Sequence, residues 1–203
     1  MLEVWIDGLC EPVNPRGIAT YGFLVKHGGL VLAREKGVIG RGNGMSNNLA
    51  EYTALTKALC YLIEHNYTDE DIVVYSDSRL LVNQMLGIWN CNGGYYYPEY
   101  KRAKQLVSSF NSITFIWIPR EQNMEADSLS REAYEEYCRK YNLEIKYHPS
   151  KKRQFTPKQR CCANCKWIRF SGPHVGCFLN YKYQKWLPKK AIWSYACANF
   201  EPA

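Results

Sequence analysis

The order in which strand patterns and helix patterns follow one another constrains the fold of this 203-residue chain more than any other feature. Alternating or β-branched apolar runs predict strands, and apolar residues spaced by three and four predict helices. The predicted strands are residues 2–7, the two arms of a hairpin over 18–40 that turns at 27–29, 71–77 and 112–119. The predicted helices are residues 47–65, 78–87, 98–110 and 123–141. Three strands joined by turns, followed by strands that alternate with helices, predict an α/β fold with a mixed sheet flanked by helices.

The first predicted helix carries one residue that does not fit its pattern. Leu55, Leu59 and Leu62 recur at helical spacing and form an apolar stripe that we expect to face the core. Glu51 lies on the same stripe, one turn before Leu55. Because burying a lone carboxylate is costly, the sequence predicts that a compensating group faces Glu51.

Three more carboxylates lie at the ends of predicted elements. Asp7 lies in or just after the first strand, Asp77 follows the strand that begins at residue 71, and Asp127 lies in the first turn of the last helix. Ligands collect at the carboxyl ends of strands in sheets with helical crossovers, so we expect Asp7, Glu51, Asp77 and Asp127 to converge. Their mutual repulsion calls for divalent cations with oxygen ligands, and Mg²⁺ suits such a site. Two ions roughly 4 Å apart can assist hydrolysis of a phosphodiester.

Each of these carboxylates also has a purely structural interpretation. A glutamate can complete a capping box, an aspartate can cap a helix or occupy a turn, and an acid can pair with a base one helical turn away. The pairs in these interpretations are Asn48 with Glu51, Asp77 with the helix starting at Ser78, Asp7 with Gly8, and Asp127 with Arg131.

Four sequence pieces, in this order, carry a family resemblance. They are "IDG" with "NPRGIATYGF", "SNNLAEYTAL", "VYSDS" and "WIPREQNMEADSLSR". Together they resemble type 1 ribonuclease H over about residues 1–145. The resemblance implies a five-stranded mixed sheet with helices on both faces. It also implies Mg²⁺-dependent endonucleolytic cleavage of the RNA strand of RNA–DNA hybrids, with 5′-phosphate and 3′-hydroxyl products.

The resemblance also implies roles for individual residues. Asp7 would bridge two Mg²⁺ ions, for which Mn²⁺ is a possible substitute, Glu51 and Asp77 would complete the shell of one ion, and Asp127 would hold the ion that carries the attacking water. The residues implied to touch the hybrid are Asn14, Ser46, Asn47 and Asn48. Side-chain amides can reach minor-groove acceptors and 2′-hydroxyls. Asn14 also fits an ordinary Asn-Pro turn, and Asn47 or Asn48 also fits a helix cap.

The chain departs from the family pattern in two places. Many members carry a histidine in the loop before the last helix, where this chain has Arg120 and no histidine. Arginine is always charged and a poor proton shuttle, so we expect Arg120 to contact phosphate instead. Some members carry a basic helical handle that grips DNA, and the corresponding segment "GIWNCNGGYYYPEYKRAK" is short and aromatic here.

The last part of the chain differs in charge from the first. Residues 1–145 hold 14 Lys and Arg against 18 Asp and Glu, whereas residues 146–203 hold 12 Lys and Arg against Glu201 alone. We interpret residues 146–160, which are basic and contain two prolines, as a linker, and residues 161–203 as a Cys-rich module. The charge predicts that this tail holds nucleic acid, with a merely solvated tail as the alternative.

The cysteine spacing of the tail predicts a metal site. Cys162-x2-Cys165 is followed by Cys177 and Cys197, and four thiolates suit a closed tetrahedral Zn²⁺ site. Cys161 can replace Cys162, and His174 can replace one cysteine. An iron–sulfur cluster uses the same ligands, and unrelated reduced thiols are the remaining interpretation. Basic and aromatic residues alternate around these cysteines, a pattern that suits phosphate attraction and base stacking.

The remaining expectations concern location and function. No apolar run approaches the roughly 20 residues of a membrane span, and the first residues lack the pattern of a signal peptide, so we expect a cytoplasmic protein that does not bind membranes. A monomer is favoured. The predicted function is a ribonuclease H with an appended zinc module that aids nucleic-acid binding. The alternatives are a catalytically silent hybrid-binding protein and a related nuclease that acts on double-stranded RNA or branched DNA.

Overall fold

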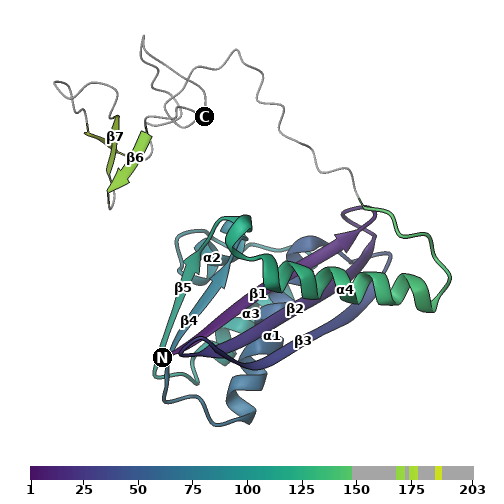
Figure 1. The fold of residues 1–203 in the computed structure, drawn as a ribbon, viewed down its shortest axis with the longest axis horizontal. Coiled ribbons are helices and arrows are strands. Elements are labelled where there is room, and N and C mark those ends of the chain that lie inside the picture. The colour runs from purple at the N-terminus through teal and green to yellow at the C-terminus, as the bar shows by residue number, and fades with distance from the viewer. Residues whose placement is uncertain (148–167, 172–173, 178–185, 189–203) are drawn as a thin grey trace. The chain divides into compact units, whose positions relative to one another are not determined.

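The structure is a computed structural model that describes residues 1–147, 168–171, 174–177 and 186–188 (Figure 1). The chain divides into two units, Met1–Ser150 and Lys151–Ala203, and each is described by itself. Among the described residues, no helix is both long and apolar enough to cross a membrane.

The first unit is built on one sheet of five strands. The strands are β1 (Leu2–Glu11), β2 (Ile18–His27), β3 (Leu30–Arg41), β4 (Asp71–Ser76) and β5 (Ser112–Trp117). Their order across the sheet is β3-β2-β1-β4-β5. The pairs among β1, β2 and β3 are antiparallel, whereas β4 pairs in parallel with both β1 and β5. The predicted five-stranded mixed sheet is therefore confirmed.

Four helices and one 3₁₀ turn accompany the sheet. They are α1 (Asn47–Glu64), α2 (Arg79–Met85), α3 (Tyr97–Val107), η1 (Arg120–Gln122) and α4 (Met124–Lys140). Figure 1 shows α4 crossing one face of the sheet, with α1 and α3 behind the other face. The four helices agree with the sequence prediction to within a few residues at each end, whereas η1 was not predicted.

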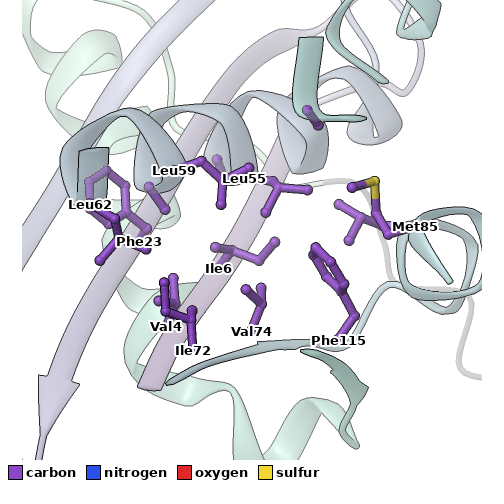
Figure 2. Packing of buried hydrophobic residues seen from close by; sticks show 14 of the residues in the cluster. Val4, Ile6, Phe23, Leu55, Leu59, Leu62, Ile72, Val74, Met85 and Phe115 are labelled. Carbon is purple, nitrogen blue, oxygen red and sulfur yellow. The ribbon is translucent and has the colours of Figure 1, made fainter. Parts of the chain in front are cut away.

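The main core lies between α1 and the sheet. Leu55, Leu59 and Leu62 of the α1 stripe are fully buried and pack with strand residues that include Val4 and Phe23 (Figure 2). Burial of a side chain of this size contributes roughly 1.5–3 kcal/mol to folding. The predicted stripe thus fixes which side of α1 faces β1 and β2, and with it the direction of Glu51.

The hairpin between β2 and β3 turns where the sequence places it. Gly28 and Gly29 both have positive φ angles, of 57° and 83°. A two-residue turn with two positive φ angles matches the right-handed twist of the flanking strands, and glycine adopts it without a steric cost.

Strand β1 extends further than predicted. It continues past Asp7 to Glu11, and it stays paired with β2 as far as the Glu11–Ile18 pair. Its pairing with β4, however, ends at Trp5 and Tyr75. Beyond that point β2 is the only strand that pairs with β1 among the described residues. The sheet therefore opens beside Asp7, on the side where β4 ends.

The second unit contains a small antiparallel sheet. Its strands are β6 (Ile168–Ser171), β7 (His174–Cys177) and β8 (Trp186–Pro188), in the order β6-β7-β8. Cys177 ends β7 and pairs with Ile168 of β6, and His174 begins β7. The other candidate zinc ligands, Cys161, Cys162, Cys165 and Cys197, lie outside the described residues.

Candidate active site

Asp7 lies in β1, just past the point where β4 ends. The residue is only 5% exposed. The Ser130 hydroxyl of α4 donates a hydrogen bond to Asp7 Oδ2. Asp7 is therefore a strand residue held by a neighbouring helix, and its interpretation as a turn aspartate before Gly8 is wrong. Ser130 was not predicted, although it follows Asp127 by three residues and so shares its side of the helix.

Glu51 reaches the same place because α1 lies unusually close to β1. A Cβ atom on Gly8 would lie 2.2 Å from the backbone nitrogen of Glu51, so only glycine permits this approach. Glu51 is 8% exposed, and its Oε2 atom is buried without a hydrogen-bond partner. The α1 cap is Ser46, whose side chain accepts from the Leu49 N–H at 3.2 Å. Glu51 is thus too far along the helix to complete a capping box, and that interpretation is wrong.

Asp77 follows β4 directly and is half-buried. Its backbone carbonyl accepts a hydrogen bond from Trp117 Nε1 at 3.0 Å. The buried Asn123 side chain donates to the Ile6 carbonyl at 2.8 Å, and its Nδ2 lies 3.5 Å from Asp77 Oδ1. Asn123 therefore bridges the ends of the two strands that carry the acids. It was not predicted, because no pattern in the sequence separates it from an ordinary residue before a helix.

The alternative role of Asp77 as a helix cap is also wrong. Ser78 is the N-cap of α2, and its hydroxyl accepts from the Leu81 N–H at 3.4 Å. The Asp77 carboxylate is therefore not needed to cap the helix.

Asp7, Glu51 and Asp77 form a compact group of three acids. One carboxylate oxygen from each lies within 4.8 Å of the other two. Burial raises the pKa of Asp7 to about 7, and the nearby charges of Asp77 and Asp127 add to the rise, while the Ser130 hydrogen bond opposes it. Burial and the charges of Asp7 and Asp77 raise the pKa of Glu51 well above its usual value. The pKa of Asp77 is raised by burial, against the opposing charge of Arg120.

These properties fit a bound divalent cation. Three close carboxylates in a poorly solvated place repel one another, and a cation with oxygen ligands removes that conflict. The unpartnered Glu51 Oε2 is a buried acceptor that such an ion would satisfy. Among the described residues no group donates a hydrogen bond to this oxygen, so a metal ion can serve as its partner.

Asp127 stands apart from the group of three. It lies in the first turn of α4, where Arg120 Nη2 contacts its Oδ1 at 2.5 Å and Arg131 Nε contacts its Oδ2 at 2.6 Å. The predicted pair between Asp127 and Arg131 is confirmed. The structure therefore brings three of the four predicted acids together and holds the fourth nearby in ion pairs.

An open cavity of about 420 Å³ surrounds the acids. Of the predicted substrate contacts, Asn14, Asn47 and Arg120 line it, together with Arg131 and Tyr147. Asn14 Oδ1 accepts from the Asn47 backbone N–H at 3.0 Å, which joins the β1–β2 turn to the start of α1. Ser46 and Asn48 do not line this cavity. Its walls thus offer amides and guanidinium groups around an acidic floor.

The comparison with known proteins identifies a family for this chain. The family model described as "Reverse transcriptase-like" matches residues 15–133, which is more than half of the chain. This chain belongs to the reverse transcriptase-like family. Glu51, Asp77 and Asp127 lie inside the matched region of the family, whereas Asp7 and Tyr147 lie outside it.

Some proteins similar to this reverse transcriptase-like chain are ribonucleases H or contain an RNase H domain. The chain is 32% identical over 135 residues to ribonuclease HI of Halobacterium salinarum, a match that covers 66% of this chain and 65% of the relative. The crystal structure of that archaeon's RNase H1 superposes with a TM-score of 0.59 at 30% identity, covering 66% of this chain and 98% of that one. The five-stranded fold is therefore the RNase H-like fold.

Two further similarities extend the comparison. A bifunctional protein of Mycobacterium tuberculosis is 36% identical over 122 residues, which cover 59% of this chain and 32% of that protein. The chain thus spans about a third of the length of this curated relative. LC11-RNase H1, solved in complex with an RNA/DNA hybrid, superposes with a TM-score of 0.62 at 28% identity, covering 68% of this chain and 99% of that one.

Proposed function

We propose that this chain is a ribonuclease H, an endonuclease that hydrolyses the RNA strand of RNA–DNA hybrids and leaves 5′-phosphate ends. The observation that carries the proposal is the meeting of Asp7, Glu51 and Asp77, from three separate elements, within 4.8 Å in an open cavity. The similarity to an RNase H1 that binds an RNA/DNA hybrid supports the choice of substrate.

The cofactor of this reaction is proposed to be a pair of Mg²⁺ ions, which Mn²⁺ can replace. Asp7, Glu51 and Asp77 would hold one ion, and Asp7 and Asp127 would hold the other. Bound ions of this kind activate the attacking water and stabilise the leaving oxygen. The Ser130 hydroxyl orients the Asp7 carboxylate, and Asn123 Nδ2 lies 3.5 Å from Asp77 Oδ1, so both proposed ligands have a polar neighbour that supports them.

The walls of the cavity support three of the proposed substrate contacts, Asn14, Asn47 and Arg120. Asn14 and Asn47, already joined by a hydrogen bond, place amide groups where an RNA strand can offer its 2′-hydroxyls and base edges. Ser46 and Asn48 flank Asn47 and are proposed as further contacts. The Arg120 guanidinium suits a phosphate, since it presents donors in a planar fork.

The test is cleavage of a labelled RNA–DNA hybrid in Mg²⁺ by the wild type, by Asp77→Asn and by Asp71→Asn. Asp71 lies exposed at the start of the same strand and is the matched control. Cleavage of the RNA strand by the wild type and Asp71→Asn, with a loss of 100-fold or more in Asp77→Asn, is the expected result (an order of magnitude drawn from single catalytic groups).

Other substrates distinguish the alternatives. Tight hybrid binding without cleavage by any of the three proteins would indicate a catalytically silent binding protein. Faster cleavage of double-stranded RNA or branched DNA than of the hybrid would indicate a related nuclease.

The tail is proposed to bind Zn²⁺ through Cys162, Cys165, Cys177 and Cys197 and to aid nucleic-acid binding. The spacing of these cysteines supports it. Elemental analysis of the purified chain should find about one zinc per molecule, and Cys165→Ser should lower that content. Iron together with sulfide would indicate an iron–sulfur cluster instead. A purified chain that contains no zinc and no iron would contradict the proposal. A cytoplasmic monomer is proposed as the working form.

A further inference from the structure

The chain turns back on itself after α4. Asn142 has a positive φ of 51°, which reverses the chain direction just after the helix ends. The Leu143 N–H then donates to the Cys138 carbonyl at 2.8 Å, and the Leu143 side chain packs against the buried Tyr134 and Cys138. Residues 141–147, which we name the return segment, therefore run back along α4 toward its beginning.

The return segment is fixed near its end by Tyr134. The Tyr134 hydroxyl donates to the Lys146 carbonyl at 2.5 Å and accepts from the Lys146 N–H at 3.3 Å. Tyr134 itself is fully buried. Because both backbone groups of Lys146 are held by one buried side chain, the core anchors the backbone directly before Tyr147.

Tyr147 lies against the arginine that holds Asp127. The Arg131 guanidinium carbon is 5.1 Å from the centre of the Tyr147 ring, a distance at which a cation and an aromatic face attract. The Tyr147 hydroxyl donates to Glu135 Oε1 at 2.6 Å. Burial raises the pKa of Tyr147 to about 12, so this hydroxyl stays protonated and remains a donor at neutral pH. Tyr147 also lines the same cavity as the three acids.

We propose that Tyr147 is a positioning residue of the active site: it holds Arg131 against Asp127 and forms part of the cavity wall. The inference rests on the proposed function, since it assigns Asp127 to a metal ion. Arg131 contacts only Oδ2 of Asp127, so Asp127 remains oriented by Arg131 when Oδ1 turns to another partner. The family model matches residues 15–133, and Tyr147 lies after its last residue. The contact between Tyr147 and Arg131 therefore comes from a part of the chain that the family model does not match.

The experiment measures metal binding directly. Calorimetric titration of metal-free full-length chain with Mn²⁺ should show an affinity about threefold or more lower in Tyr147→Ala than in the wild type, the range expected for a lost cation–aromatic contact. Tyr147→Phe keeps the ring and loses only the bond to Glu135, so its affinity should lie close to that of the wild type. Tyr141→Ala, in the same segment but outside the cavity, is the control and should bind normally.

Cleavage kinetics give a second readout. The Mg²⁺ concentration for half-maximal cleavage should rise in Tyr147→Ala by the same factor as the calorimetric affinity falls. Equal metal affinity in Tyr147→Ala and wild type, with an unchanged circular dichroism spectrum, would overturn the inference. If Tyr147→Ala does not fold, Tyr147→Leu takes its place, because leucine is apolar but has no aromatic face. Tyr147→Leu should show the same loss of Mn²⁺ affinity, and a wild-type Mn²⁺ affinity in this variant would overturn the inference.

The two proposals fail separately. A chain that binds Mn²⁺ in a Tyr147-dependent way but leaves the hybrid intact would contradict the ribonuclease activity and keep the positioning role. A chain that cleaves the hybrid with the same metal dependence in all variants would contradict the positioning role of Tyr147 and support the ribonuclease activity.

Discussion

Asp127 is held by two arginines whose surroundings differ. Arg120 comes from the short η1 turn and its side chain is 58% exposed. Arg131 comes from α4, and its side chain is 35% exposed and lies against the Tyr147 ring. Because Arg131 is the better supported of the two, Arg120 is the partner that Asp127 releases most easily. The metal ion proposed for Asp127 Oδ1 would therefore compete with the Arg120 guanidinium for the same oxygen.

This competition predicts that loss of the Arg120 side chain strengthens metal binding. Arg120→Gln should raise the Mn²⁺ affinity of the nucleic-acid-free chain by up to about fivefold, the range set by an exposed ion pair. The same variant should have a higher KM for the hybrid, since it lacks the proposed phosphate contact. Calorimetry and steady-state kinetics measure the two effects, with Arg34→Gln, whose pair with Glu125 lies elsewhere on the surface, as the control. A lower Mn²⁺ affinity in Arg120→Gln would contradict the competition.

Asp7 makes the stability of the metal-free chain depend on pH. Its pKa is about 7 in the folded state against 3.8 as the ordinary value, so the folded state binds more protons between these pH values. The free energy of unfolding should therefore fall as the pH rises from about 4 to 7 in EDTA. Asp7→Asn removes this loss and should be more stable than the wild type at pH 8, on the order of 2–4 kcal/mol, but not at pH 4.

Thermal denaturation at both pH values measures this difference. Adding Mg²⁺ at pH 8 should stabilise the wild type and leave Asp7→Asn nearly unchanged, because a ligand that binds only the folded state raises its stability. A metal-free wild type that is equally stable at pH 4 and pH 8 would contradict the raised pKa of Asp7 in the folded state.

At the scale of elements, the site depends on how closely α1 approaches β1. Gly8 faces the helix where Ala50 and Glu51 pass, and its missing side chain allows the contact. The end of the β1–β4 pairing at Trp5 and Tyr75 then leaves space beside Asp7. A close approach on one side and an opening on the other together create a cavity whose floor is acidic.

Gly8→Ala tests the close approach. The added Cβ would meet backbone atoms, which cannot rotate away, so β1 and α1 must separate. We expect a loss of about 1–3 kcal/mol or more in urea denaturation, together with weaker Mn²⁺ binding. Gly40→Ala is the control, because its Cβ would meet only the flexible end of Met45 at 3.1 Å and should cost little. Normal stability in Gly8→Ala would show that the gap between helix and strand is wider than described.

The elements were predictable from sequence, and some of the contacts between them were not. The apolar stripe of α1 has helical spacing, and β4 and β5 are short runs rich in β-branched residues. The type and the order of these elements can therefore be predicted from the sequence. The acids were found because they interrupt those patterns. Asn123 and Ser130 could not be found in this way, since each is polar in a polar stretch and becomes buried only when α4 meets β1. The return segment was missed for the same reason: its position depends on a hydrogen bond from Tyr134, twelve residues earlier.

At the scale of the whole molecule, charge separates the two units. Residues 148–203 hold eleven Lys and Arg against Glu201, whereas the first unit is acidic and carries the proposed active site. We therefore expect that phosphate neutralisation in the proposed nucleic-acid complex comes mostly from residues 148–203.

A chain that ends at Tyr147 should distinguish the contribution of residues 148–203 to hybrid binding from the cleavage step. It keeps the core, the three acids and the return segment, so its kcat should stay within about threefold of the full chain, a modest change in barrier. Its KM for the hybrid should rise by about tenfold or more at 50 mM salt, and the difference should shrink as salt increases. Steady-state kinetics over a salt series measures both. Equal KM values at low salt would show that the tail does not hold the substrate.

The return segment has a consequence for the order of folding during synthesis. The cavity draws on Asp7 near the start of the chain and on Tyr147, 140 positions later, so a ribosome-bound intermediate that lacks the last turn of the first unit holds an incomplete site. Residues 148–203 emerge only after Tyr147. The unit that carries the proposed active site is therefore completed late in its own synthesis but before residues 148–203 emerge. If the proposed activity is right, a nascent chain would be able to cut the hybrid before it acquires most of its positive charge.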